Sequence, residues 1–408
     1  MKRRVVITGI GAVTPLGLSM DATWSELLKG SSGVRINPNW NNFEGLKSQL
    51  FAGVSNFTPP AHWSRKTTRS LTRAGLFALS SAEQAIQQAK LTESDVLKSG
   101  RCGIAFGSCL AGGDALLEIA RSCIGRSIKG VNASLFTQAM THSSAAVLAI
   151  NFGIKGRVIP SSSACTSSSQ AIGYGYESIL SGAQDIMLAG GAEEESLPLA
   201  LLFGAMHATS INNGDPEQAC KPFDTTRDGL VIGEGGCTFV IEALDHAEKR
   251  GAIPIAEVVG FATNCDGEHI TSPTPETMSK VIELSLSQGE VSPNDIGYIH
   301  AHATGTKVGD LAESEAIYHH FRDEVPVSAL KSYFGHTMGS CGSLEAACAI
   351  YSMNNSTIIP TRNFESLDPE CCPIFLAREI MNKEGIRYVM SNNFAFGGVN
   401  TSLIFARL

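Results

Sequence analysis

The stretch SSSACTSSSQ, residues 161–170, places one cysteine among small residues where a β-run ends and a helical pattern begins. The β-run covers residues 157–160 and the helical pattern covers residues 171–180. We therefore expect Cys165 to lie exposed at the start of a helix. There the helix dipole and the free backbone N–H groups favour the thiolate, and the same N–H groups can receive an oxyanion. An inert cysteine packed in a serine-rich turn is the alternative.

Two histidines downstream favour the reactive interpretation. The segment YIHAHATGT (298–306) is a short apolar run that ends in turn-forming residues, so it predicts a strand that delivers His302 to a loop. The segment KSYFGHTMG (331–339) places His336 at a second boundary, before a helix expected from about Gly342 to Met353. A lone histidine is more often a core or surface residue. The order Cys, His, His in glycine-containing turns is what indicates a site.

At these residues the chain resembles the β-ketoacyl-[acyl carrier protein] synthases, the condensing enzymes of fatty-acid and type II polyketide assembly. The likeness covers nearly the whole chain and begins with VVITGIGAVTPLG, residues 5–17. Further blocks follow in the family's order: ACTS (164–167), AGGAE (189–193), PFD (222–224), RDG (227–229), GEG (233–235), HITSP (269–273), Asp310 with Glu313, and NFAFGGVN (393–400). So many ordered blocks make the likeness specific.

The resemblance implies a decarboxylative Claisen condensation. An acyl group bound to Cys165 would react with malonyl-acyl carrier protein and give 3-oxoacyl-acyl carrier protein in fatty-acid, polyketide or aryl polyene biosynthesis. His302 and His336 would donate hydrogen bonds to the enolate that decarboxylation forms. The backbone N–H groups of Cys165 and Phe396 would form a second oxyanion hole.

The resemblance also implies supporting roles. Lys331 would orient neighbouring groups and add positive potential, whereas a surface lysine is the ordinary case. Glu313 would lie behind the site, whereas a solvated helix-face charge is the alternative. Phe396 would act as a gate, whereas an aromatic residue with a packing role only is the alternative. The expected substrate-binding positions are those for the phosphopantetheine arm (Thr304, Thr306), the acyl chain (Leu110, Met140, Phe203) and the gate's movement (Gly397, Gly398).

The chain departs from the family pattern at several positions. Ala303 stands where glycine is common, Lys221 where arginine is usual, and Cys341 in a segment usually rich in Gly and Ala. Ala303 adds one methyl group, so we expect a shifted loop rather than a lost site. Residues 141–144 (THSS) are more polar than usual near the expected acyl pocket, which argues against a plain long saturated chain. Residues 158–167 also resemble synthases from aryl polyene clusters.

Three other classes remain to be weighed. A thiolase-type acyltransferase shares the fold but carries a second catalytic cysteine late in the chain, where this sequence has Phe396 followed by two glycines. A non-catalytic chain-length-factor subunit is expected to lack Cys165. A cysteine hydrolase could use Cys and His, but no separate water-activating arrangement is evident.

The composition of the chain limits which partners and which cellular compartment we expect. The chain has 408 residues, 43% of them hydrophobic and 17% charged, which allows a large buried core. Its net charge of -8 and the lack of a long basic run argue against nucleic acid. The eleven cysteines show no CxxC spacing, which favours reduced thiols in the cytosol. We expect acyl carrier protein as partner, with its phosphopantetheine and no bound cofactor or metal, and a homodimer or a heterodimer with a related subunit.

Strand and helix patterns alternate along the chain, which predicts an α/β protein. The resemblance implies the thiolase fold, a five-layered α-β-α-β-α sandwich of two similar halves. We divide these into residues 1–252, with the cysteine, and residues 253–408, with the two histidines; residues 5–9 and 257–260 look like equivalent opening strands. The basic N-terminus precedes an apolar run interrupted by polar residues, so we expect a strand rather than a secretory signal, and no membrane span.

Overall fold

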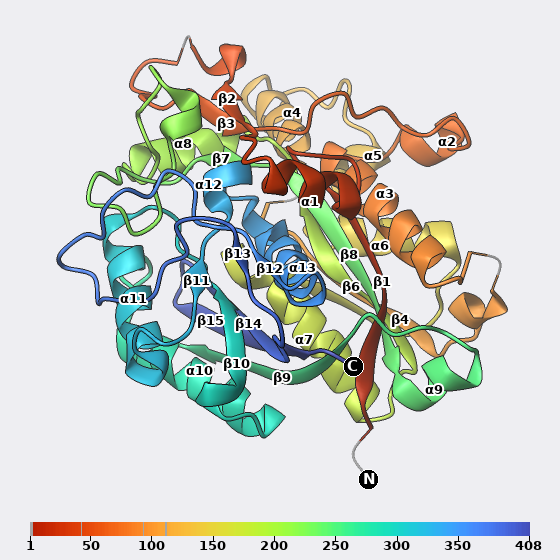
Figure 1. Cartoon of the computed structure of the whole chain (residues 1–408). Helices are drawn as coiled ribbons and strands as arrows, with labels where there is room; N and C mark the ends of the chain where they lie inside the picture. The colour runs from red at the N-terminus through yellow and green to blue at the C-terminus, as the bar shows by residue number, and fades with distance from the viewer. Residues whose placement is uncertain (1–2, 42, 93, 111) are drawn as a thin grey trace.

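Runs of buried apolar residues form a ten-stranded mixed sheet at the centre of the molecule (Figure 1). The computed structural model describes residues 3–41, 43–92, 94–110 and 112–408. The first half of the chain supplies β1 (Val5–Val13), β4 (Cys102–Gly107), β5 (Val158–Ser161), β6 (Ile186–Glu193) and β8 (Gly235–Ala243). The second half supplies β9 (Ala256–Cys265), β10 (Ile296–His300), β11 (Val327–Ser328), β14 (Tyr388–Phe394) and β15 (Val399–Ala406).

The strand order repeats between the two halves of the sheet. From its outer edge, the first half runs β5-β4-β6-β8-β1 and the second runs β11-β10-β14-β15-β9. In the first half, β4 pairs in parallel with β5 and β6, and β8 pairs antiparallel with β6 and β1. In the second half, β10 pairs in parallel with β11 and β14, and β15 pairs antiparallel with β14 and β9. The halves join where β1 and β9 pair antiparallel, with Val5 opposite Val258. The expected opening strands are thus neighbours.

Helices form three layers around this sheet. The central layer contains α7 (Ser167–Leu180) and α13 (Cys341–Asn354), which pack on each other and on strands of both halves. The outer layers contain α3 (Arg73–Gln88) with α6 (Ser143–Phe152), and α10 (Pro275–Gly289) with α11 (Lys307–Phe321). Figure 1 shows the two outer layers on opposite sides of the molecule. The expected α-β-α-β-α sandwich is confirmed.

The central helices are buried almost all round, because the two halves of the sheet cover them on both sides. Residues 341–350 of α13 are all buried, and α7 has small residues where it meets the sheet. A Cβ atom on Gly173 would come 2.2 Å from the ring of Phe261 in β9, so only glycine allows this approach. The close packing brings the N-terminal ends of α7 and α13 together beside the sheet.

The remaining elements cover the ends of the sandwich. They are α1 (Met20–Leu28), β2 (Val34–Ile36), β3 (Leu50–Ala52), α2 (Arg65–Thr68), α4 (Gly113–Ile124), α5 (Ala133–Gln138), α8 (Leu197–Ala205), β7 (Ile232–Gly233), α9 (Leu244–Lys249), α12 (Lys331–Phe334), β12 (Thr357–Ile358) and β13 (Met381–Asn382). The chain's apolar N-terminal segment is the buried strand β1, while Met1 and Lys2 lie outside the described residues. Among the helices described, none combines the length and apolarity needed to cross a bilayer.

Candidate active site

Cys165 lies in a sharp turn between the edge strand β5 and helix α7. A 3-10 turn (Ala164–Thr166) makes the connection, and Ala164 takes a φ of 50°, a left-handed conformation that costs about 1–2 kcal/mol for a residue with a Cβ. The serine hydroxyls of the turn are used inside it: Ser163 N–H donates to Ser167 Oγ at 2.9 Å. The turn therefore holds the thiol at the helix start, as the sequence predicted.

The thiol itself differs from the expectation, because it is buried and neutral. Cys165 is only 7% exposed. Burial raises its pKa to about 11, and Lys331 together with the backbone N–H groups of Phe396 and of Cys165 lowers it only in part. Loss of hydration outweighs the helix terminus here. The two N–H groups expected to form an oxyanion hole both point at the sulfur.

His336 faces this sulfur with a protonated nitrogen. Its Nε2 lies 3.0 Å from Cys165 Sγ. Its Nδ1 accepts a hydrogen bond of 3.2 Å from the backbone N–H of Met338, so the ring's single proton in the neutral state lies on Nε2. The turn that follows His336 thus selects the tautomer.

His302, two residues after the end of strand β10, has the same tautomer for a different reason. Its Nδ1 lies 3.1 Å from Lys331 Nζ, which also donates to the His302 carbonyl at 2.6 Å. An ammonium group has only donors, so Nδ1 must accept and Nε2 carries the proton. The two imidazole rings stand almost perpendicular, with centroids 5.3 Å apart.

A buried ion pair maintains these neutral histidines. Lys331 donates to Glu345 on α13, and neither side chain is exposed. Burial opposes the charge on Lys331, but the Glu345 carboxylate raises the pKa of Lys331 above its ordinary value. Burial and then the Lys331 charge lower the pKa of His302 and His336 well below 6.5. Two neutral N–H donors therefore converge beside a thiol.

This donor set does not fit a metal ion, although its spacing would allow one. The candidate ligand atoms of Cys165, His302 and His336 lie within 4.8 Å of one another. A metal-binding imidazole donates its second N–H to a carboxylate or carbonyl. Here both Nδ1 atoms face donors, Met338 N–H and Lys331, so both Nε2 lone pairs are taken by protons.

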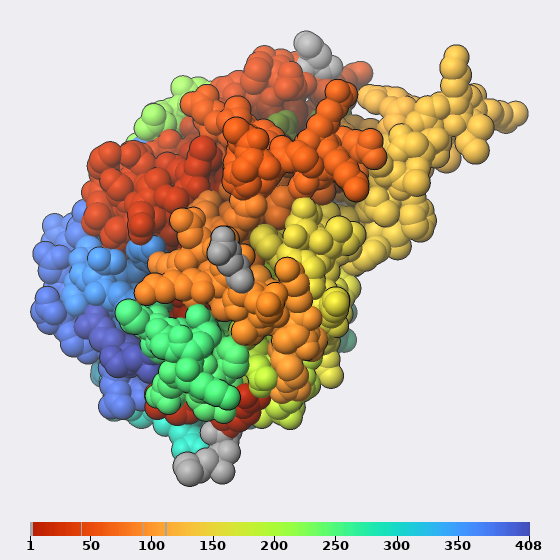
Figure 2. Space-filling model, turned by 90° about the vertical axis from the view of Figure 1, so that its right-hand side faces the viewer, coloured from red at the N-terminus to blue at the C-terminus, as the bar shows by residue number. Residues whose placement is uncertain are grey.

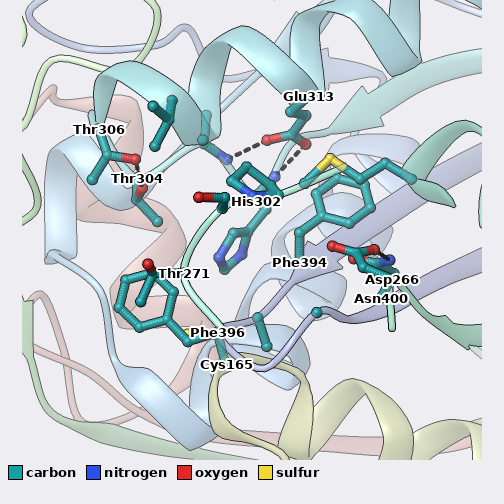
Figure 3. A pocket seen from close by; sticks show the side chains of 18 of the residues that line it. Cys165, Asp266, Thr271, His302, Thr304, Thr306, Glu313, Phe394, Phe396 and Asn400 are labelled. Atoms are coloured by element: carbon teal, nitrogen blue, oxygen red, sulfur yellow. Dashed lines mark hydrogen bonds between the residues drawn. The ribbon is translucent and has the colours of Figure 1, made fainter. Parts of the chain in front are cut away.

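Glu313 of α11 holds the loop that carries His302. Its carboxylate accepts the backbone N–H of His302 at 2.8 Å and of Ala303 at 2.6 Å, the dashed contacts in Figure 3. The side chain is buried, and burial raises its pKa to about 8. Its alternative as a solvated charge is wrong. The methyl group of Ala303 leaves this contact intact.

One cavity connects most of the predicted residues to solvent. Its empty volume is ≈ 670 Å³, part of which lies in its open mouth. The predicted residues that line it are Cys165, Phe203, His302, Thr304, Thr306, Glu313, His336, Phe396 and Gly398. The hydroxyls of Thr304 and Thr306 lie 3.0 Å apart, on the opposite side of the cavity from Phe396 in Figure 3.

The aromatic ring of Phe396 stacks on Phe203, with centroids 5.8 Å apart and an interplanar angle of 21°. Gly397 and Gly398 follow at φ values of 89° and 73°, which residues with a Cβ adopt at a cost. The backbone at Phe396 thus bends sharply between the sulfur of Cys165 and the cavity wall.

Four predicted residues lie outside the cavity lining, and one of them is Lys331, which lies behind His302. Leu110 packs in the same apolar cluster as Phe203 and Phe396, next to the cavity. Met140 is 37% exposed and lies just after α5. Gly397 donates its N–H to the Ile270 carbonyl at 2.8 Å.

Sequence reasoning did not single out three buried polar residues. Glu345 pairs with Lys331, and Asn393 donates to Glu345 at 2.6 Å. Glu193 lies at the end of β6. Glu193 and Asn393 lie inside the motifs AGGAE and NFAFGGVN, but a motif does not show what its polar residues contact. Asp266, which accepts from Asn400 at 2.6 Å, lines the cavity mouth without a comparable signal.

Known proteins resemble the chain over its whole length. The beta-ketoacyl synthase N-terminal domain matches residues 2–247 and the C-terminal domain matches residues 255–365. A relative from Haemophilus influenzae named 3-oxoacyl-[acyl-carrier-protein] synthase 1 is 36% identical, over 99% of each chain.

Two solved structures agree. A beta-ketoacyl synthase from Burkholderia phymatum is 44% identical with a TM-score of 0.97, and all of each chain is covered. The ishigamide ketosynthase/chain length factor is 30% identical with a TM-score of 0.92, again over all of each chain. The full-length matches and the shared architecture have one consequence: the chain belongs to the beta-ketoacyl synthase family.

Proposed function

We propose that the protein is a 3-oxoacyl-[acyl carrier protein] synthase that condenses an acyl group on Cys165 with malonyl-acyl carrier protein. The observation that carries the proposal is the convergence of Cys165 Sγ with two imidazole N–H donors whose tautomers are set by their surroundings. Family membership and the name of the 36% identical relative support it.

The first step is acyl transfer. The Cys165 sulfur attacks the carbonyl carbon of an acyl-carrier thioester, a C–S bond forms, and the carrier's thiol leaves with the proton that Cys165 gives up. The backbone N–H groups of Cys165 and Phe396 already point at this position and would receive the oxyanion of the tetrahedral intermediate. In the resting site they hydrogen-bond to the sulfur instead.

The second step is decarboxylation. As the malonyl C–C bond breaks and CO2 leaves, its electron pair forms an enolate whose charge lies on the thioester oxygen. The Nε2–H groups of His302 and His336 would donate to that oxygen. Because both rings are neutral, they stabilise the charge without a proton transfer. Lys331 and Glu345 orient His302 and add no net charge as a pair.

The third step joins the two parts. The enolate carbon attacks the carbonyl of acyl-Cys165, and the resulting oxyanion returns to the N–H groups of Cys165 and Phe396. Collapse of the intermediate releases the Cys165 thiolate, which takes up a proton, and leaves 3-oxoacyl-carrier protein. CO2 is the second product.

The carrier's phosphopantetheine arm would enter through the ≈ 670 Å³ cavity. Thr304 and Thr306 offer two adjacent hydroxyls to its amide groups, Phe396 lies across from them, and Gly398 also lines the cavity. No cofactor other than this arm takes part in the proposed steps. The eleven free thiols favour a reducing compartment, so we place the enzyme in the cytosol.

The alternatives have weaker support. A thiolase would need a second thiol in the cavity, but Cys341, which lies near Cys165, donates to the Cys165 carbonyl at 3.1 Å and does not line the cavity. A chain-length factor would not need the reactive set of Cys165, His302 and His336. Fatty-acid, polyketide and aryl polyene precursors all remain within the proposal.

We further propose that the protein works as a dimer. Each subunit consists of two similar halves, and the boundary between them lies between residues 252 and 253. The repeated strand order supports the division. Strand β5 lies at the edge of the sheet, a position that favours pairing with a second subunit. Figure 2 shows α4 and α5 (ochre) projecting from the body, and Ile128 there is 85% exposed.

Acyl transfer and decarboxylation test the proposal separately. Incubation with acyl carrier protein is expected to add one acyl group to the chain by intact-protein mass, and Cys165→Ala is expected to remove this addition. His302→Ala and His336→Ala are each expected to lower CO2 release from malonyl carrier protein by about 100- to 1000-fold, with acylation retained to some degree. His319→Ala, an exposed position on α11, is the control. Acylation that persists in Cys165→Ala, or normal CO2 release in either histidine variant, contradicts the proposal.

A further inference from the structure

A fully buried carboxyl group joins two turns next to the site. Glu193, the last residue of β6, is 0% exposed. Its Oε2 accepts the backbone N–H of Cys109 at 2.6 Å and of Gly339 at 3.1 Å. Its Oε1 accepts the backbone N–H of Leu110 at 3.3 Å and the hydroxyl of Ser108 at 3.2 Å. Burial raises the pKa of Glu193 to about 8, and these backbone donors lower it only in part.

One of the two turns forms the wall beside the acyl position. Residues 108–110 follow strand β4, and Leu110 packs with Phe203, Phe396 and Met338 in one apolar cluster. Because Phe396 also contributes its N–H to Cys165, an acyl chain on the sulfur would lie against this cluster. A chain that displaces Leu110 would therefore move the turn that Glu193 holds.

The other turn orients His336. Met338 N–H donates to His336 Nδ1, and the next N–H, that of Gly339, donates to Glu193. The turns also touch directly: a Cβ on Gly339 would come 2.4 Å from the Cys109 nitrogen and 2.7 Å from Glu193 Oε2. The turn at residues 108–110 therefore packs directly against the turn that follows His336.

We propose that Glu193 is a positioning residue that couples the acyl-pocket wall at Leu110 to the orientation of His336. An acyl group of suitable length on Cys165 then leaves the Met338–Gly339 turn where His336 can donate to the enolate. An unsuitable one shifts this turn and weakens decarboxylation. This inference rests on the proposed function and adds a source of primer selectivity that acts at the second step.

The neighbouring residue Glu194 provides a matched control. It is also a buried carboxylate that accepts two backbone N–H groups, from Ala74 and Gly113, both at 2.9 Å. These donors lie in the first turns of α3 and α4, so Glu194 holds helix ends rather than the His336 turn. Glu193→Gln and Glu194→Gln make the same chemical change one residue apart.

The experiment measures two rates in each variant: acylation of Cys165 by intact-protein mass, and CO2 release from malonyl carrier protein by the acylated enzyme. The Gln side chain presents an NH2 group to backbone donors, so the turn is displaced in Glu193→Gln. We expect the ratio of CO2 release to acylation to fall by about tenfold or more, as for other small misplacements of reacting groups. Glu194→Gln is expected to keep the wild-type ratio.

Primer length gives a second readout. In the wild-type enzyme, CO2 release is expected to vary with the length of the acyl group already on Cys165, and in Glu193→Gln this variation is expected to disappear. An unchanged ratio and length dependence in Glu193→Gln, or an equal fall in Glu194→Gln, overturns the inference and leaves Glu193 as a structural residue only.

A third variant, Glu193→Asp, keeps the proposal testable if Glu193→Gln fails to fold. Glu193→Asp keeps the carboxyl group, but its shorter side chain cannot bridge both turns, so the same fall in ratio is expected, and a wild-type ratio overturns the inference. A wild-type enzyme that neither acylates Cys165 nor releases CO2 instead contradicts the proposed function. The two failures are therefore distinguishable.

Discussion

Single residues at this site act through what lies behind them. The two imidazoles are chemically alike, yet Nδ1 of His336 accepts a backbone N–H and Nδ1 of His302 accepts an ammonium hydrogen. Both contacts place the ring proton on Nε2, toward the cavity. The Asn393 amide also donates to Nδ1 of His302, at 3.3 Å, so this tautomer rests on two side-chain partners.

The buried thiol of Cys165 predicts a steep pH dependence of its reactivity. With a pKa of about 11, the thiolate fraction rises as the pH rises, and it does so throughout the neutral range. Alkylation by iodoacetamide, followed as mass added at Cys165, is expected to quicken about tenfold per pH unit up to about pH 10. The Cys165→Ala variant corrects for the other thiols. A plateau near neutral pH would instead indicate the activated thiolate that the helix start alone suggested.

The histidines predict the opposite behaviour for decarboxylation. Burial and Lys331 hold the pKa of His302 and His336 well below 6.5, so both rings stay neutral as the pH falls toward about 5.5. The rate of CO2 release by pre-acylated enzyme is therefore expected to show no inflection near pH 6.5. An acid limb centred there would mean that an imidazole with an ordinary pKa controls the step.

At the scale of elements, the site forms where strands end and central helices begin. Strand β5 leads through the Ala164 turn into α7, and β10 ends two residues before His302. The start of α13 lies directly behind Cys165, through the contact of Cys341 with its carbonyl. Short connections to the sheet fix the positions of the reacting groups. The loop that carries Phe396 differs from them, because Gly397 and Gly398 follow Phe396 in it.

The turn after β4 predicts a primer-length effect. Leu110 packs with Phe203 and Phe396, so Leu110→Ala opens space beside the acyl position. Preference in the extension assay is expected to move toward longer primers, by roughly 1–3 kcal/mol per accommodated methylene. Met140→Ala, at an exposed position, is the comparison. An unchanged primer-length preference in Leu110→Ala would contradict this role of Leu110 and would favour the polar residues 141–144 as the determinant of primer choice.

The Phe396 segment predicts that the half-reactions can be uncoupled. The ring rests on Phe203, and the two glycines that follow allow the backbone to change conformation. Phe396→Ala is expected to leave acylation of Cys165 measurable and to lower the condensation rate. Single-turnover measurements of the two steps check this. A variant that condenses at the wild-type rate would reduce Phe396 to a packed aromatic.

At the scale of the whole molecule, neither half carries a complete site. The first half supplies Cys165, the second supplies both histidines and Lys331, and they meet because α7 and α13 pack together between the sheet halves. The pairing of β1 with β9 makes the two halves one continuous sheet. The site depends on this junction, so changes there are expected to affect stability and activity together.

The exposed apolar residues of α4 and the segment after it predict self-association. Ile124 is 84% exposed and Ile128 is 85% exposed on the projecting segment seen in Figure 2. The double variant Ile124→Glu with Ile128→Glu is expected to reduce the subunit interaction, because charges would have to be buried. Analytical ultracentrifugation of both proteins measures the shift toward monomer. A wild-type protein that sediments as a monomer rejects the homodimer and leaves a related second subunit to be tested.

The sequence alone indicated the family, because the family's short motifs are local patterns in the chain. The layered architecture and the roles of the candidate thiol and histidines were then expected from that resemblance. Tertiary structure decided the protonation states, because the pKa of Cys165 depends on burial and that of His302 on Lys331, which follows it by 29 residues. It also decided the pairing of Glu345 with Lys331 and the contacts of Glu193. Desolvation and long-range hydrogen bonds arise only when distant segments pack, so no local pattern encodes them.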